Sequence, residues 1–209
     1  MTQLLGAFRR ERNGLVADTM HYEGARYGLN YGVSLPTVRQ IVRRMERDHA
    51  FARFLYGQDV RCLQLAAIHL ADAERLADPN EVDFWLAGIR NSELAEEAAF
   101  ALVSRYTGFA TLYEERVSTA EPMHLYLLLM AAARHAAPAV EWLESSYAAV
   151  VGYAEHPLHR LLTAALITLW AAIGVSSNEA RNKTAELLAR LDGSVWNDHL
   201  REEIAWRIA

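Results

Sequence analysis

The feature that most constrains this chain is a helical period that runs through almost all of its 209 residues. Apolar residues recur three and four positions apart, and no alternating apolar and polar run of convincing length interrupts them. Such a chain can bury its apolar side chains only by packing helices against helices. The predicted fold class is therefore all-α, with about 11–12 helices joined by short loops. Residues 3–12 and 15–23 form one predicted N-terminal region that is broken or bent near Asn13-Gly14. The other predicted helical segments span residues 35–46, 49–56, 59–71, 81–90, 93–105, 107–116, 121–135, 138–153, 157–173, 178–191 and 195–207.

The helical segments form pairs that recur about every 35–45 residues, which is the spacing of HEAT-like α-solenoid repeats. Each pair would bury one face against its neighbours, and the second helix of each pair would line a concave surface. We therefore predict a single HEAT-like repeat domain over residues 1–209. A compact helical bundle produces the same periodicity, so the pattern alone leaves that alternative open.

Residues that commonly cap helices mark the starts of several predicted helices. Ser34, Asp48 and Asp78 each precede a helical segment, and their short polar side chains can accept a bond from a free backbone N–H. Pro36 sits near a first helical position, where its missing N–H does no harm. A break is predicted at Asn91-Ser92, between two further helices.

Charge is distributed unevenly along the chain. The formal net charge is −5, but residues 1–75 carry 11 Arg and 8 acids, whereas residues 76–209 are strongly acidic. A protein this acidic is not expected to bind nucleic acid over its whole surface, because that affinity rests on neutralising phosphates. The imbalance restricts any basic face to the first third of the chain.

Four arginines of that first third are spaced to form one stripe on a predicted helix. They are Arg39, Arg43, Arg44 and Arg47. One interpretation is an outward polar face paired with Glu46 and Asp48. The other is contact with DNA phosphates, which positions a duplex without reading its sequence.

Several features favour a cytoplasmic protein without a membrane span. The apolar run from Leu125 to Ala133 holds about nine residues, whereas a membrane span needs about 20. At the N-terminus, Arg9 and Arg10 follow the apolar residues, which is the wrong order for a secretory signal. Cys62 is the one cysteine, and its apolar helical surroundings indicate a buried side chain.

Three carboxylates lie just inside the start of a predicted helix, at Glu93, Glu96 and Glu97. Negative charge is stable there, because the first turn of a helix has unpaired N–H groups and a partial positive charge. One interpretation is therefore a solvated helix start. The other is a site that uses a fixed negative charge.

No metal site is predicted. His156 and His159 are three residues apart, but no third ligand lies nearby, so these are interpreted as cap and surface histidines. The tryptophans all sit on amphipathic helices and are interpreted as packing residues. They are Trp85, Trp142, Trp170, Trp196 and Trp206.

Residues 27–39, Tyr-Gly-Leu-Asn-Tyr-Gly-Val-Ser-Leu-Pro-Thr-Val-Arg, resemble the early signature of the bacterial DNA alkylation repair family. That signature has an aromatic-rich turn, then Gly-Val or Gly-Ile, then Pro-x-x-Arg or a close variant. The segment from Trp85 to Leu102 resembles the helix pair that carries the family's central acidic motif. The resemblance covers residues 15–105 by motif and the remainder by helix pattern.

The resemblance implies a HEAT-like solenoid whose concave, basic face holds duplex DNA. Active members are glycosylases that release 3-alkyl and 7-alkyl purines without a metal or cofactor. Their central motif reads Trp-Asp-x-x-Asp, and its second carboxylate stabilises the positive charge that develops on the deoxyribose. A fixed carboxylate beside an oxocarbenium-like centre is a sound way to lower that barrier.

Carried over to this sequence, the motif falls on residues 92–96, Ser-Glu-Leu-Ala-Glu. The resemblance makes Glu96 the catalytic carboxylate, and it places Ser92 and Glu93 at the substrate. Ser92 stands where the family has an aromatic residue. His124 stands near the position of a family arginine, and the resemblance places it with Glu93 at the rim of the substrate site.

The expected function is thus DNA binding of the alkylation repair type, with excision of alkylated purines by Glu96. The expected partner is duplex DNA, damaged or branched, with Arg39, Arg43 and Arg90 at its phosphates. No cofactor is implied. The alternative is a non-catalytic HEAT-repeat scaffold that binds a protein partner, which the net charge of −5 favours. The oligomeric state is left open.

Overall fold

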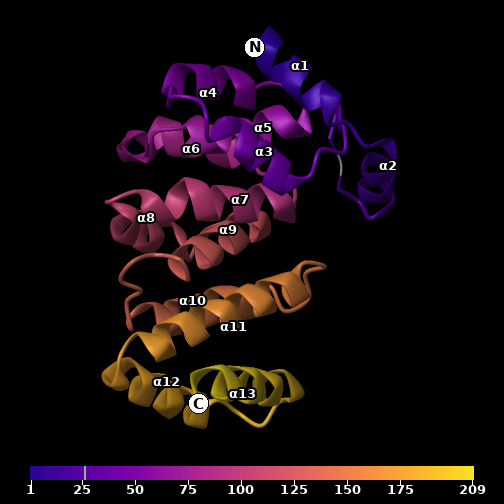
Figure 1. Ribbon diagram of the computed structural model, residues 1–209. Helices are drawn as coiled ribbons and strands as arrows, with labels where there is room; N and C mark the ends of the chain where they lie inside the picture. The colour runs from indigo at the N-terminus through magenta and orange to yellow at the C-terminus, as the bar shows by residue number, and fades with distance from the viewer. Residues whose placement is uncertain (26) are drawn as a thin grey trace. The chain divides into compact units, whose positions relative to one another are not determined.

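The computed structural model describes residues 1–25 and 27–209. Within these residues the chain forms thirteen α-helices and two 3₁₀ helices (Figure 1), so the all-α prediction is confirmed. The described residues contain no strand, apart from one isolated parallel bridge between Leu29 and Val60. Arg26, inside the glycine-rich connection before the third helix, lies outside the described residues.

The chain divides into two compact units, Met1–Thr107 and Gly108–Ala209. The prediction of a single repeat domain over residues 1–209 stays a prediction. The first unit contains α1 (Thr2–Arg10), α2 (Gly14–Tyr22), α3 (Leu35–Val42), α4 (His49–Tyr56), α5 (Arg61–Leu70), the 3₁₀ helix η1 (Ala73–Ala77), α6 (Pro79–Ala87), α7 (Ser92–Ala101) and the 3₁₀ helix η2 (Val103–Arg105).

The core of the first unit is built around α5. Every residue of this helix is buried except His69, which is half-buried. α5 packs against α4, α3 and α7, and Figure 1 shows these helices side by side. Cys62 is buried in the same helix, as predicted. Because α5 is surrounded, any polar group on it must find its partner on a neighbouring helix.

Three predicted helix starts are confirmed by their caps, whereas the helix predicted from residue 138 begins only at Trp142. The side chains of Ser34, Asp48 and Asp78 accept bonds from the backbone N–H groups of the following first turns. The break at Asn91-Ser92 is also present, since α7 begins at Ser92 and Asn91 caps it through the N–H of Leu94, 3.0 Å away. Short polar side chains at these positions therefore fix where the helices begin.

The end of α3 differs from the prediction. A helix over 35–46 was expected, but α3 ends at Val42 and Arg43 is its C-cap. The chain then tightens through bonds from the N–H of Arg44 to Ile41 and from that of Met45 to Val42. It turns here because Asp48, in an extended conformation, caps the next helix. The prediction of a continuous arginine stripe on one helix is therefore wrong.

The second unit contains α8 (Phe109–Arg116), α9 (Pro122–Ala132), α10 (Trp142–Val151), α11 (His159–Ser176), α12 (Asn178–Arg190) and α13 (Val195–Ile208). Its centre is α11, which packs against the other helices from α9 to α13. The indole N–H of Trp170 donates to the Ser146 hydroxyl at 3.0 Å, and that of Trp196 donates to the Thr163 hydroxyl at 3.0 Å. These bonds satisfy the polar ends of two packing residues.

The prediction that all five tryptophans pack inside the protein is wrong for one of them. Trp206, near the end of α13, is 77% exposed. Its ring lies against the guanidinium of Arg207, 5.4 Å from the ring centroid. The other four are buried or half-buried.

Helix α11 is long and apolar enough to cross a membrane by length and composition. More than half of it is buried inside the second unit. That burial is what the packing of a central core helix produces.

Candidate functional site

The three carboxylates at the start of α7 have different surroundings. Consecutive residues of a helix are rotated by about 100° from one another, so Glu96 and Glu97 point in different directions. Glu96 is exposed, Glu93 is half-buried, and Glu97 is only 2% exposed. The interpretation of all three as a solvated helix start is therefore wrong for Glu97.

Glu97 is held by residues from two other helices. From α3, the Nε of Arg39 donates to Oε1 at 2.9 Å and its Nη2 donates to Oε2 at 2.5 Å. From α5, the Nε2 of His69 also bonds to Oε1. Burial raises the pKa of Glu97, but the bonds and charges of His69 and Arg39 outweigh it and lower the pKa to about 2. Glu97 is thus a charged carboxylate with both oxygens occupied.

Glu93 is held one helical turn earlier. The Nε of Arg61 lies 2.7 Å from Oε2, and its Nη2 pairs with Oε1. The hydroxyl of Tyr27 donates to Oε2 at 2.5 Å. Arg61, which is 3% exposed, also donates to the carbonyl of Val33 at 2.6 Å. Burial and the negative charge of Glu93 both raise the pKa of Tyr27.

The two carboxylates together form a ladder that joins four parts of the first unit. The Glu93 rung links α7 to α5 and to the loop over residues 27–33. The Glu97 rung links α7 to α3 and α5. Both charges are neutralised by bidentate arginines, which is the strongest geometry for such pairs. The arrangement positions α3 and the loop before it against α7.

Sequence reasoning named Arg39 as a phosphate contact and missed Arg61 and His69, which also hold these carboxylates. Arg61 and His69 are the charged or titratable positions near the two ends of an otherwise apolar helix. A charge at a position that the helical period places in the core needs a partner of opposite sign. That signal indicates buried acids on a neighbouring helix, but it does not identify the acidic residues.

The other predicted site residues of α7 lie at the surface or near it. Ser92 is half-buried at the first helical position, and Glu96 is exposed one turn later. Phe100, a further turn along, is 43% exposed. The guanidinium groups of Arg39 and Arg105 lie 5.0 Å and 5.7 Å from its ring centroid. Glu96 and Phe100 are four residues apart and so share one face of α7.

The remaining predicted residues lie on different elements. Arg90 is in the loop before α7 and forms an exposed ion pair with Asp59 at 3.3 Å. Arg43 is exposed at the end of α3. His124 is half-buried on α9, in the second unit. The ladder and Arg43 therefore belong to the first unit, and His124 does not.

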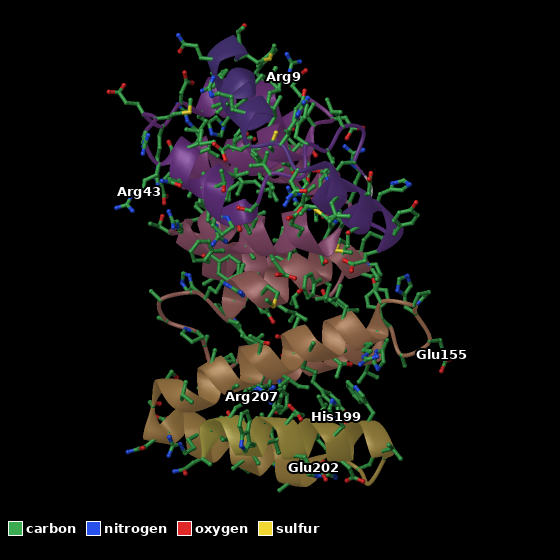
Figure 2. All side chains as sticks on the ribbon, turned by 45° about the vertical axis from the view of Figure 1, so that its right-hand side comes forward. Arg9, Arg43, Glu155, His199, Glu202 and Arg207 are labelled. Carbon is green, nitrogen blue, oxygen red and sulfur yellow. The ribbon has the colours of Figure 1, made fainter. Side chains whose placement is uncertain are left out.

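Seven exposed arginines of the first unit form no ion pair with another described residue; one of them, Arg105, lies over the Phe100 ring, and the other six lie at or just after the ends of α1 and α3. These six are Arg9, Arg10, Arg12, Arg43, Arg44 and Arg47, and we call them the α1–α3 arginine cluster. The residues that follow α1 are joined to the loop before α3, because the N–H of Asn13 donates to the carbonyl of Tyr31 at 2.8 Å. Glu11 also lines one pocket with Thr37, Gln40 and Ile41 of α3 and with Arg44. Figure 2 shows Arg9 and Arg43 projecting from the surface of this unit.

The described residues show no group of three or more His, Cys, Asp or Glu side chains arranged to hold a metal ion. His156 accepts a bond from the N–H of Leu158 at 3.1 Å, but Leu158 is itself the N-cap of α11 and no side chain caps that helix, so the interpretation of His156 as a helix cap is wrong. His159 is half-buried, and its ring lies 5.2 Å from that of Trp196, so it is not a surface histidine.

Comparison with known proteins gives one informative likeness. No family model matches the chain, and no curated protein matches it. A solved structure is similar over 98% of this chain and 94% of its own, with a TM-score of 0.74 and 11% identity. It belongs to "a new family of proteins related to the HEAT-like repeat DNA glycosylases with affinity for branched DNA structures". The likeness confirms the predicted HEAT-like repeat fold, so the compact-bundle alternative is wrong.

Proposed function

We propose that this protein binds DNA and that the first unit makes the main phosphate contacts. The observation that carries the proposal is the α1–α3 arginine cluster, whose charges are not balanced by acids of the described chain. The HEAT-like repeat fold supports it, because a structure of the same fold comes from a family with affinity for branched DNA. Branched DNA is accordingly the first substrate to test.

The net charge of −5 does not conflict with this proposal. Phosphate contacts act over short distances, since the Debye length is about 8 Å at physiological ionic strength. The first 75 residues carry 11 of the 21 basic residues, and the acids are concentrated later in the chain. An arginine without an internal partner keeps its donors for a phosphate, which it can bind through two parallel bonds.

The three arginines predicted at the phosphates differ in what they have left to donate. Arg43 belongs to the α1–α3 arginine cluster and forms no ion pair with an acid of the described residues. Arg39 gives two donors to Glu97 and keeps a side chain that is 42% exposed. Arg90 pairs with Asp59, where both side chains are about half exposed, so a phosphate would have to replace that acid. We therefore assign the larger role to Arg43 and its neighbours.

The test is a binding titration with labelled duplex, nicked and branched DNA at low salt. The variant Arg43→Gln with Arg44→Gln should lose about tenfold or more in affinity. Each phosphate contact releases counterions from the DNA, and the variant loses that favourable release. The matched control is Arg160→Gln with Arg181→Gln, which removes two exposed arginines of the second unit that form no ion pair with a described residue. Equal losses in both pairs, or no binding of any DNA by the wild type, would refute the proposal.

Excision of alkylated purines is a separate and finer step. Of the three acids on α7, Glu96 is exposed, whereas Glu93 is half-buried and Glu97 is buried. Any catalytic carboxylate would therefore be Glu96. Release of 7-methylguanine from methylated duplex by the wild type, and its loss in Glu96→Gln, is the criterion. DNA binding without release would leave a binding protein, and a stable protein partner without DNA binding would favour the scaffold.

A further inference from the structure

An aromatic ring near the end of α7 contacts two guanidinium groups from different elements. Phe100 is 43% exposed. The guanidinium carbon of Arg39, from α3, lies 5.0 Å from the ring centroid, and that of Arg105, from η2, lies 5.7 Å from it. Both distances lie within about 6 Å, the range of a cation–π contact. The ring therefore brings two positive groups together at the surface of the first unit.

The two arginines differ in the donors that they have left. Arg39 gives its Nε and Nη2 groups to Glu97, at 2.9 Å and 2.5 Å, and its Nη1 group forms no bond with a described residue. Arg105 is exposed and forms neither a hydrogen bond nor an ion pair with a described residue. A guanidinium whose face lies against a ring keeps the N–H donors along its edges. The pair thus offers several directed donors and, at Arg105, a positive charge that no described acid balances.

We propose that Arg39 and Arg105, positioned by Phe100, bind the phosphate backbone of a DNA strand. Arg43 is the C-cap of α3 and lies four residues after Arg39, so both lie on one side of that helix. A strand that contacts the α1–α3 arginine cluster through Arg43 can therefore continue past Arg39 to Arg105. The inference rests on the proposed DNA binding, and it extends the contact surface from α3 to the end of α7.

A phosphate fits this site better than a base. Phe100 already contacts two guanidinium groups, so a base that stacked on the ring would compete with them, whereas a phosphate uses their free edges. The exposed acid on the same face of α7 is Glu96, one helical turn before Phe100. Arg105 follows the end of α7, in the opposite direction along the chain. We therefore place the phosphate at that end, where its repulsion by Glu96 is weaker.

The experiment measures the binding of labelled duplex and branched DNA over a series of salt concentrations. Arg105→Gln should weaken binding to every DNA by about three- to tenfold and make the salt slope shallower by about 0.9, the value of one phosphate contact. The matched control is Arg181→Gln, an exposed arginine of the second unit without an ion pair to a described residue, and it should change neither quantity. Arg39 is kept, because its loss would remove a partner from the buried Glu97.

Variants of Phe100 test whether the ring positions the two arginines. Phe100→Leu keeps an apolar side chain without a ring and should weaken binding about threefold, whereas Phe100→Tyr keeps the ring and should bind as the wild type does. In the Arg105→Gln background, Phe100→Leu should cost less, because one of its two partners is already gone. Phe54→Leu is the control, since Phe54 is 50% exposed on α4, and it should have no effect. The melting temperatures of these variants should match that of the wild type.

The outcomes separate this inference from the proposed function. An unchanged salt slope in Arg105→Gln, or equal losses in Phe100→Leu and Phe100→Tyr, would overturn the inference. So would a loss in Phe100→Leu that is confined to DNA with unpaired bases, because that pattern belongs to base stacking. If Arg43→Gln with Arg44→Gln weakens binding and Arg105→Gln does not, the proposed function stands and this inference fails. The reverse result would keep the contact at Arg105 and refute the main role of the α1–α3 arginine cluster.

Discussion

Adjacent carboxylates on α7 differ because of where the helix points them. Glu96 faces outward, whereas Glu97 is enclosed by Arg39 and His69 at 2% exposure. A buried carboxylate is stable only when its charge is matched, and here two partners on different helices match it. The ion pair between Arg39 and Glu97 therefore neutralises the buried charge and also holds α3 against α7.

The lowered pKa of Glu97 predicts a specific dependence of stability on pH. Because the pKa is about 2 in the folded protein and 4.5 in the reference state, its contribution is fully present above about pH 5. It should be lost as the pH falls from about 4.5 towards 2. Glu97→Gln should lower the free energy of unfolding by about 2–3 kcal/mol at pH 7, since Arg39 then loses its anion.

Urea denaturation at pH 7, 4 and 3 measures this effect. The difference between wild type and Glu97→Gln should shrink as the pH falls, because protonation removes the same charge from the wild type. Glu46→Gln is the control, and it should change stability by less than about 0.5 kcal/mol because Glu46 is exposed. A difference that is independent of pH would show that the carboxylate charge is not what stabilises the site.

The identity of the buried acid was the part of the site hardest to predict. Sequence resemblance placed the important carboxylate at Glu96, and helix geometry places the best-bound one a residue later, at Glu97. A shift of one residue rotates the side chain by about 100°. Which of two neighbouring glutamates turns inward depends on how α7 is rotated against α5. That rotation cannot be predicted from the spacing of residues within α7.

At the scale of helices, the starts that carry a capping side chain were predictable, and the end of α3 was not. Ser34, Asp48 and Asp78 use a local chemical signal, in which a side chain bonds the backbone two or three residues ahead. The end of α3 has no comparable signal. Arg43 and Arg44 fit a helix as well as a turn, so the chain leaves the helical path there because the cap at Asp48 requires an extended approach.

The joint between α1 and α3 rests on a glycine. Gly32 has a φ of +67°, and a Cβ built on it would overlap the backbone carbonyl of Asn13. Gly32→Ala should therefore lower the free energy of unfolding by more than about 2 kcal/mol, combining left-handed strain with a backbone clash. It should also weaken DNA binding, because the clash moves the end of α1 away from α3.

Gly24→Ala is the matched control for this substitution. Gly24 has a φ of +88° but open space around its Cβ position, so only the strain of about 1–2 kcal/mol applies. Thermal and urea denaturation of the two variants gives the comparison. If Gly32→Ala proves no more destabilising than Gly24→Ala, then the close approach to Asn13 does not hold α1 in place.

At the scale of the whole molecule, the all-α class followed from the helical period, whereas the choice of a repeat fold over a compact bundle came from the helix spacing together with the family resemblance. Apolar residues at the helical spacing leave few ways to build a core, and the structure adopts the HEAT-like one. The function did not follow in the same way. The charge counted along the sequence shows an acidic protein. It does not show which arginines form ion pairs with acids in the folded protein. Ion pairs in three dimensions engage several arginines of the first unit, among them Arg39, Arg61 and Arg90, and leave the α1–α3 arginine cluster and Arg105 without an acidic partner among the described residues.

That cluster predicts how DNA affinity depends on salt. The logarithm of the association constant should fall linearly with the logarithm of the salt concentration, with a slope of about −0.9 for each phosphate contact. Arg43→Gln with Arg44→Gln removes two contacts and should make the slope shallower by about 1.8. Arg160→Gln with Arg181→Gln should leave it unchanged. A general charge effect would make both slopes shallower by the same amount. That result would contradict phosphate contacts that are specific to the α1–α3 surface.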